Sequence, residues 1–268
     1  MSRTPLPLRD RLRAAAPSAM RPLLHALLDL ALALAAMLLL SLVFMAGWAT
    51  WLTLAEGGAP PHLAARLQQP GVVAQIAMSV LVTGVPALAL FLWRRPADAG
   101  ERAHSLRQAA RPSTWAWAMA TGIGVFALAS GAVALVERLG VKATPSNLAL
   151  VEAALRTQPA LLVLFAVVLA PLYEELLFRR VVFGRLWAAG RPGLGMLLSG
   201  AAFALLHEPP GPGGQPPAAF ALLWTAYGLM GVAFAWVYRR TGTLWAAIGA
   251  HALHNALGCA ALLLGTPG

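Results

Sequence analysis

Charge and thiols are scarce in this chain of 268 residues. Charged residues make up 11% of the sequence, against about 25% in a typical soluble domain. Only ten residues are acidic, and the single cysteine, Cys259, excludes an internal disulfide. Cys259 lies in an apolar run and has no obvious base in register, so we interpret it as a small buried residue. This composition is not that of a soluble domain.

Hydrophobic residues fill 59% of the chain and form continuous runs. Continuous rather than alternating runs indicate helices and not a barrel. The fold class is therefore predicted to be an all-α polytopic membrane protein. A membrane span requires about 20 apolar residues. About seven spans are predicted, and six or eight remain open if the fourth is broken or Leu148 to Leu155 is re-entrant. They lie at roughly 24–50, 72–93, 114–136, 160–187, 193–207, 218–238 and 242–264.

The basic residues flank these runs instead of forming one patch, so the net charge of +10 does not predict nucleic-acid binding. Sixteen of the twenty lie in the N-terminal tail or after the second, fourth and sixth spans. The positive-inside rule then predicts a cytoplasmic N-terminus. We expect residues 1–22 to form an Arg-rich cytoplasmic tail and residues 23–268 a single membrane domain. The run from Leu30 to Leu54 exceeds a signal-peptide core, which favours a permanent anchor. The predicted location is a bacterial inner membrane.

Polar side chains within the late spans form three clusters. Because Glu175 and Arg179 are four residues apart, they can form an ion pair on one helix face, whereas Glu174 points about 100° away. His251 and Asn255 have the same spacing. At about 1.5 Å per residue, Glu174, His207 and His251 fall at matched depth. The three clusters are Glu174, Glu175 and Arg179; Phe203 and His207; and His251, His254 and Asn255.

Charged groups at membrane depth are costly and usually functional. Each cluster alone also fits a packing role, and His254 is most simply structural. Together they predict one pocket that cleaves a peptide bond with water, which requires a base, an acid and oxyanion donors. A glutamate and two histidines are also a ligand set that a divalent metal such as Zn2+ accepts. The serine-hydrolase motif G-x-S-x-G is absent, and two prolines follow His207–Glu208, so no H-E-x-x-H zinc helix exists.

These residues give the chain a resemblance to the CPBP family of intramembrane proteases (CAAX protease and bacteriocin-processing, or Abi). The family motifs E-E-x-x-x-R, F-x-x-x-H and H-x-x-x-N appear complete and in order. The resemblance covers about residues 160–260. The motifs stand as Glu174-Glu175-x-x-x-Arg179, Phe203-x-x-x-His207 and His251-x-x-x-Asn255.

The resemblance implies that Glu174 and His207 activate the attacking water. It implies that His251 and Asn255 stabilise the oxyanion, or that His251 joins Glu174 and His207 around a metal. Glu175 and Arg179 are then supporting residues. The implied substrate is a membrane-associated protein or peptide, processed in CAAX or bacteriocin and self-immunity fashion. The implied cofactor is either Zn2+ or none, since a metal-free glutamate mechanism fits the same residues.

Two other functions fit the polar clusters less well. A non-catalytic membrane scaffold or immunity factor does not need every chemical group of the three motifs. A proton-coupled transporter uses Glu and His relays, but the sequence lacks the two similar hydrophobic halves typical of transporters. We therefore predict an intramembrane endopeptidase.

Overall fold

A computed structural model describes residues 20–58, 63–68, 70–211 and 215–265. The predicted Arg-rich tail lies almost entirely outside the described residues. The described part is helical and contains no strand. Its elements are α2 (Met20–Ala55), α3 (Leu63–Gln68), α4 (Val72–Ser79), η1 (Val80–Gly84), α5 (Val85–Arg94), α6 (Ala99–Ala109), α7 (Pro112–Arg138), α8 (Leu148–Thr157), α9 (Pro159–Val163), η2 (Leu164–Leu169), α10 (Ala170–Glu175), η3 (Leu176–Phe183), α11 (Gly184–Ala188), α12 (Pro192–His207), α13 (Pro217–Thr241) and α14 (Leu244–Gly265).

The membrane-spanning character of the chain is confirmed. Six helices in the described residues are long and apolar enough to cross a bilayer. They match six of the seven predicted spans, and the remaining one, the fifth, corresponds to α12, an apolar helix of 16 residues. The fourth span runs unbroken from Pro159 to Ala188. Leu148 to Leu155, for which a re-entrant segment is the alternative prediction, lies in the separate helix α8. The chain is an integral multi-pass membrane protein, and its orientation stays a prediction.

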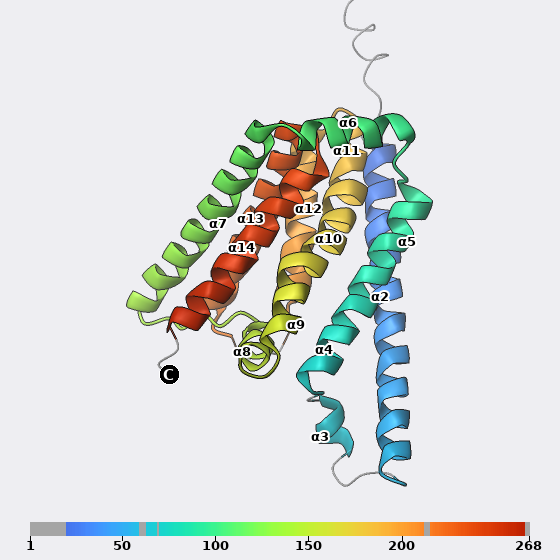
Figure 1. Cartoon of the computed structure of the whole chain (residues 1–268), viewed down its shortest axis with the longest axis vertical. Helices are drawn as coiled ribbons and strands as arrows, with labels where there is room; N and C mark the ends of the chain where they lie inside the picture. The colour runs from blue at the N-terminus through green and yellow to red at the C-terminus, as the bar shows by residue number, and fades with distance from the viewer. Residues whose placement is uncertain (1–19, 59–62, 69, 212–214, 266–268) are drawn as a thin grey trace, which may run out of the picture.

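The two ends of the helix bundle differ. In Figure 1, α6 lies across one end, where α2 begins, whereas α14 ends at the opposite end near α8. Helix α6 is polar and starts with a capping box, in which Asp98 accepts from the Glu101 N–H and Glu101 accepts from the Asp98 N–H. Most of the basic residues that follow the second, fourth and sixth spans are near this end. We refer to it as the basic end.

Wide helical turns precede two of the prolines inside spans. The π-helical segments η1 and η2 end just before Pro86 and Pro171, respectively. A proline has no N–H to donate to the carbonyl four residues earlier, so a regular α-helix is disturbed there. The π-helix η3 then follows Glu175 directly. Such turns are frequent at functional sites because they redirect side chains, and here they lie on both sides of the paired glutamates.

Small residues let the late helices approach closely. A Cβ atom added to Gly200 on α12 would lie 2.6 Å from the Gly228 carbonyl oxygen on α13, so glycine is required there. A Cβ atom on Gly122 of α7 would lie 2.6 Å from the Ala250 carbonyl oxygen on α14. Close backbone contact of this kind is the usual way in which helices associate in lipid. It brings α12, α13 and α14 together around the fourth span.

Candidate active site

The paired glutamates lie at the junction between α10 and η3, and both are buried. Their side chains diverge as predicted. Glu175 forms an ion pair with Arg179, with Oε2 3.1 Å from Nε. Glu174 points instead toward α12 and α14. Its Oε2 lies 3.7 Å from His207 Nε2 and 3.8 Å from His251 Nε2. The structure thus brings together the three residues that sequence analysis placed at matched depth.

Glu175 holds His251 as well as Arg179. His251 Nδ1 lies 2.9 Å from Glu175 Oε1, and a carboxylate oxygen can only accept, so Nδ1 carries the proton. The His251 ring also stacks on Phe234, with centroids 4.9 Å apart. These two contacts fix the ring with Nε2 toward Glu174. The sequence predicted a supporting role for Glu175, but the contact with His251 was not anticipated.

Arg179 is completely buried and shielded by aromatic rings. Its guanidinium carbon lies 4.6 Å from the Phe203 ring centroid and 5.3 Å from that of Phe234. Its Nη2 donates to the Gly231 carbonyl oxygen at 3.2 Å. An unpaired buried charge would cost several kcal/mol, so the rings, the carbonyl and Glu175 together make this arginine tolerable. Arg179 thereby fixes Glu175.

His207 ends α12 and is held from three sides. Its Nδ1 donates to the Phe203 carbonyl at 2.9 Å, which leaves Nε2 toward Glu174. The imidazole ring stacks between Phe203 and Tyr227, at centroid distances of 4.2 Å and 4.7 Å. The hydroxyl of Ser146 donates to the His207 carbonyl at 2.5 Å and so anchors the helix end. Neither Tyr227 nor Ser146 belongs to a motif, so sequence spacing could not predict their contacts with His207.

The remaining polar residues of α14 have separate positions. Asn255 Nδ2 donates to the Ala166 carbonyl on η2 at 2.7 Å, so one of its two N–H bonds is already used. His254 packs edge-to-face on Phe126, with ring centroids 6.0 Å apart. Its Nδ1 is buried without a hydrogen-bond partner in the described residues. In the described residues, His254 forms no hydrogen bond or ion pair with Glu174, and its structural role stays a prediction.

Three proton acceptors face one another at the centre of this cluster. Both histidines use Nδ1 as a donor, so in their neutral form each presents a lone pair on Nε2. Glu174 Oε2 is buried and has no hydrogen-bond partner in the described residues. Acceptors without a donor are unfavourable at low dielectric. A water molecule supplies two donors. Because Glu174 Oε2 and His207 Nε2 are 3.7 Å apart, one water molecule can lie about 2.8 Å from both atoms.

The metal alternative gains no support from this geometry. In the part of the chain that the structure describes, no group of three or more His, Cys, Asp or Glu side chains is placed to hold a metal ion. Glu174, His207 and His251 are chemically suitable ligands, but as they lie they do not form such a group.

A cavity of about 700 Å³ adjoins the cluster. Glu174, His207, His251 and Asn255 all line it, and it extends along α7 and α14 to the residues before α8. Its walls are largely apolar. The space is large enough for an extended segment of several residues, because ligand cavities typically measure about 300–1,000 Å³.

Comparisons with known proteins agree with the motifs. The sequence model of the family "Type II CAAX prenyl endopeptidase Rce1-like" matches residues 156–257. The Bacillus subtilis (strain 168) protein named "Putative membrane peptidase YdiL" is 30% identical over 95 residues. That alignment covers 35% of this chain and 34% of the relative, so it spans about a third of the relative's length. No solved structure matches the chain. The resemblance is confirmed for residues 156–257, and the family match points to a protease.

Proposed function

We propose that the protein is an intramembrane endopeptidase that hydrolyses a peptide bond with a water molecule held by Glu174 and His207. The observation that carries the proposal is the buried Glu174 Oε2, which has no hydrogen bond in the described residues and faces two imidazole Nε2 atoms. A buried carboxylate with a purely structural role normally accepts hydrogen bonds through both of its oxygens. An acceptor that is left unpaired beside two other acceptors suits a general base.

In the proposed reaction, Glu174 takes a proton from water as the water oxygen attacks the peptide carbonyl carbon. The carbonyl oxygen becomes an oxyanion in a tetrahedral intermediate. His207 and Glu174 then deliver a proton to the amine nitrogen as the C–N bond breaks. One water molecule is consumed, and a carboxylic acid and an amine are formed.

The oxyanion requires hydrogen-bond donors at the same place. Asn255 has a second N–H besides the one that binds the Ala166 carbonyl, and it lines the cavity together with His251. We assign these two residues to the oxyanion, with His251 donating through Nε2 in its protonated form. Glu175 and Arg179 do not contact the substrate, and they act by orienting His251.

The substrate class follows from the position of the cavity within the bundle. We propose a protein or peptide segment in or at the bilayer, consistent with CAAX-type or bacteriocin-type processing. We also propose a bacterial inner membrane as the location. Prenylation of the substrate is not required by any residue of the cavity.

The test is cleavage of a fluorogenic membrane-peptide library by the purified full chain in detergent. We expect Glu174→Ala and His207→Ala each to reduce turnover by about 10²–10⁴-fold. The matched control is Glu152→Gln on α8, which changes a carboxylate that does not line the cavity. Melting temperatures of all variants report folding. Full activity in either alanine variant would contradict the proposal and favour a binding or scaffold role.

A further inference from the structure

A second cavity lies at the basic end, beneath α6 and away from the candidate active site. It measures about 740 Å³. Residues of α5, α6, α10, η3, α11, α13 and α14 line it, and none of them lines the first cavity. Leu172 and Leu176 form part of its floor, each two residues from Glu174 and so on the opposite face of the same helix. The proposed proteolysis makes no use of this cavity.

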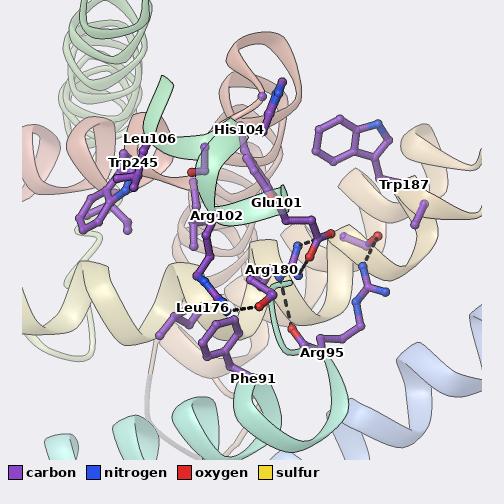
Figure 2. A pocket seen from close by; sticks show the side chains of 18 of the residues that line it. Phe91, Arg95, Glu101, Arg102, His104, Leu106, Leu176, Arg180, Trp187 and Trp245 are labelled. Atoms are coloured by element: carbon purple, nitrogen blue, oxygen red, sulfur yellow. Dashed lines mark hydrogen bonds and ion pairs between the residues drawn. The ribbon is translucent and has the colours of Figure 1, made fainter. Parts of the chain in front are cut away.

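The roof of the cavity is rich in arginine. Arg95, Arg102 and Arg180 line it against one carboxylate, that of Glu101. Figure 2 shows Arg102, Arg180 and Glu101 close together, with Phe91 and Leu176 beneath them. Arg180 Nη2 lies 2.6 Å from Glu101 Oε2, so that single carboxylate already has a cation. The other two arginines give the cavity an excess positive charge.

Arg95 and Arg102 bond only to backbone carbonyl groups. Arg95 Nη2 donates to the Gly184 carbonyl at 3.3 Å, and its Nε is buried with no partner in the described residues. Arg102 donates to the Ala97 carbonyl. Within the described ranges, neither forms an ion pair with a carboxylate. Burial lowers the pKa of Arg95, and the neighbouring Arg180 and Arg185 guanidinium groups lower it further, against a smaller opposing effect of Glu101.

The floor and walls of the same cavity are apolar and extend inward. Phe91 comes from α5, Leu172 from α10, and Trp245 and Ile248 from α14. From Arg180 to Leu172 is eight residues, or about 12 Å along the helix axis toward the middle of the span. Charge therefore lies at the level where the spans end, and a hydrophobic surface continues from it into the bilayer depth.

We infer that this cavity binds an anionic phospholipid, with the phosphate between Arg95 and Arg102 and an acyl chain along Leu172, Leu176 and Ile248. Guanidinium groups suit phosphate because their N–H bonds form paired hydrogen bonds with its oxygens. The apolar groove fits an acyl chain, which a phospholipid has and a soluble phosphate lacks. Trp245, which is partly exposed at the groove, is typical of a membrane interface.

The test is native mass spectrometry of the delipidated full chain in detergent, titrated with phosphatidylglycerol or phosphatidylcholine. We expect phosphatidylglycerol to bind at least about tenfold more tightly, given the energy of charge-assisted hydrogen bonds. Arg102→Gln should remove about that factor. The matched control is Arg107→Gln, which removes the same charge from α6 at a residue that does not line the cavity.

Two further arms separate the lipid from its headgroup. Glycerol 3-phosphate should not compete with phosphatidylglycerol at equal concentration, and Leu176→Trp, which fills the groove, should weaken lipid binding while Arg95 and Arg102 remain. Melting temperatures identify any variant that fails to fold. If Leu176→Trp does not fold, the test rests on Arg102→Gln, which lies on the exposed helix α6. Equal binding of both lipids, equal loss in Arg107→Gln, or full competition by glycerol 3-phosphate would each overturn the inference.

Discussion

Two buried carboxylates in this membrane protein have opposite surroundings. Asp29, on α2 at the basic end, is completely buried and saturated. Its Oδ1 lies 2.7 Å from Arg94 Nε, and its Oδ2 lies 2.5 Å from Arg185 Nη2. Glu174 is also buried, yet its Oε2 faces only two imidazole nitrogens at 3.7 Å and 3.8 Å.

The difference separates a structural carboxylate from a reactive one. Asp29 joins three segments, α2, the end of α5 and α11, and both its oxygens are committed to them. Nothing remains for a substrate. Glu174 leaves an oxygen free at the edge of a cavity, and its neighbour Glu175 performs the structural task of holding His251 and Arg179. Glu175 Oε2 also lacks a hydrogen bond in the described residues, but it has an arginine partner. A buried carboxylate oxygen without an arginine partner therefore marks the candidate base.

Asp29→Asn is the substitution expected to have the largest effect on stability. It leaves two arginines without a counter-ion, and breaking buried ion pairs costs about 3–5 kcal/mol. Denaturant titration in mixed micelles measures the free energy of unfolding. In contrast, Glu174→Gln should leave that free energy within about 1 kcal/mol of wild type, because no pair with an arginine is lost, and should abolish cleavage.

The control for Asp29 is Glu56→Gln. Glu56 forms an exposed ion pair with Arg66, and such pairs contribute about 0–1 kcal/mol. The folded fraction of Asp29→Asn should retain near wild-type turnover per molecule. If Asp29→Asn were as stable as wild type, or Glu174→Gln as unstable as Asp29→Asn, the distinction between the two carboxylates would fail.

Glu175→Gln should have an intermediate effect on stability and a partial effect on activity. The amide oxygen can still accept from His251 Nδ1, but Arg179 loses its counter-ion, at a cost of about 3 kcal/mol. We expect kcat to fall about tenfold with KM unchanged, because the residue positions His251 without contacting substrate.

Glu175→Ala provides the sharper comparison, since it removes the acceptor for His251 as well. Its kcat should fall below that of Glu175→Gln, because no acceptor then remains to hold His251 Nδ1. Equal kcat values in the two variants would mean that the hydrogen bond to His251 does not contribute to turnover.

The sequence was sufficient to predict the helices and the gathering of Glu174, His207 and His251. Long apolar runs determine membrane helices almost by themselves, and motif spacing with helix rise predicted the shared depth. The Asp29 ion pairs could not be predicted, because they join residues 65 and 156 positions apart whose meeting depends on helix rotation. Tyr227 and Ser146 were missed for the same reason. The bond from Glu175 to His251 also depends on the wide turns around α10, which ideal helix geometry does not anticipate.

Acidification should have a small effect through Glu101 on α6. The hydrogen bond from Arg180 lowers the pKa of Glu101 from 4.5. A carboxylate with a depressed folded-state pKa stabilises the protein above the unfolded value and loses that contribution as pH falls through the folded value. We therefore expect wild type to lose more stability below about pH 4.5 than Glu101→Gln does. Because Glu101 is about half exposed, the difference should be only a few tenths of a kcal/mol. Parallel melting curves from pH 3 to 7 measure it, and coincident pH dependence would contradict it.

Metal removal should have the smallest effect of all. The proposed reaction uses Glu174 and His207 as the groups that move protons, and no three ligand side chains in the described residues are placed around one point. Treatment with EDTA or 1,10-phenanthroline should therefore leave turnover unchanged, and the purified active protein should contain well under one zinc per chain by elemental analysis.

The informative control is His251→Ala, which removes one possible ligand and one oxyanion donor at once. Loss of activity in this variant without any chelator effect supports the donor role. Chelator inhibition that zinc reverses, with stoichiometric zinc in wild type and none in His251→Ala, would instead assign Glu174, His207 and His251 to a metal and make Glu174 a ligand rather than the base.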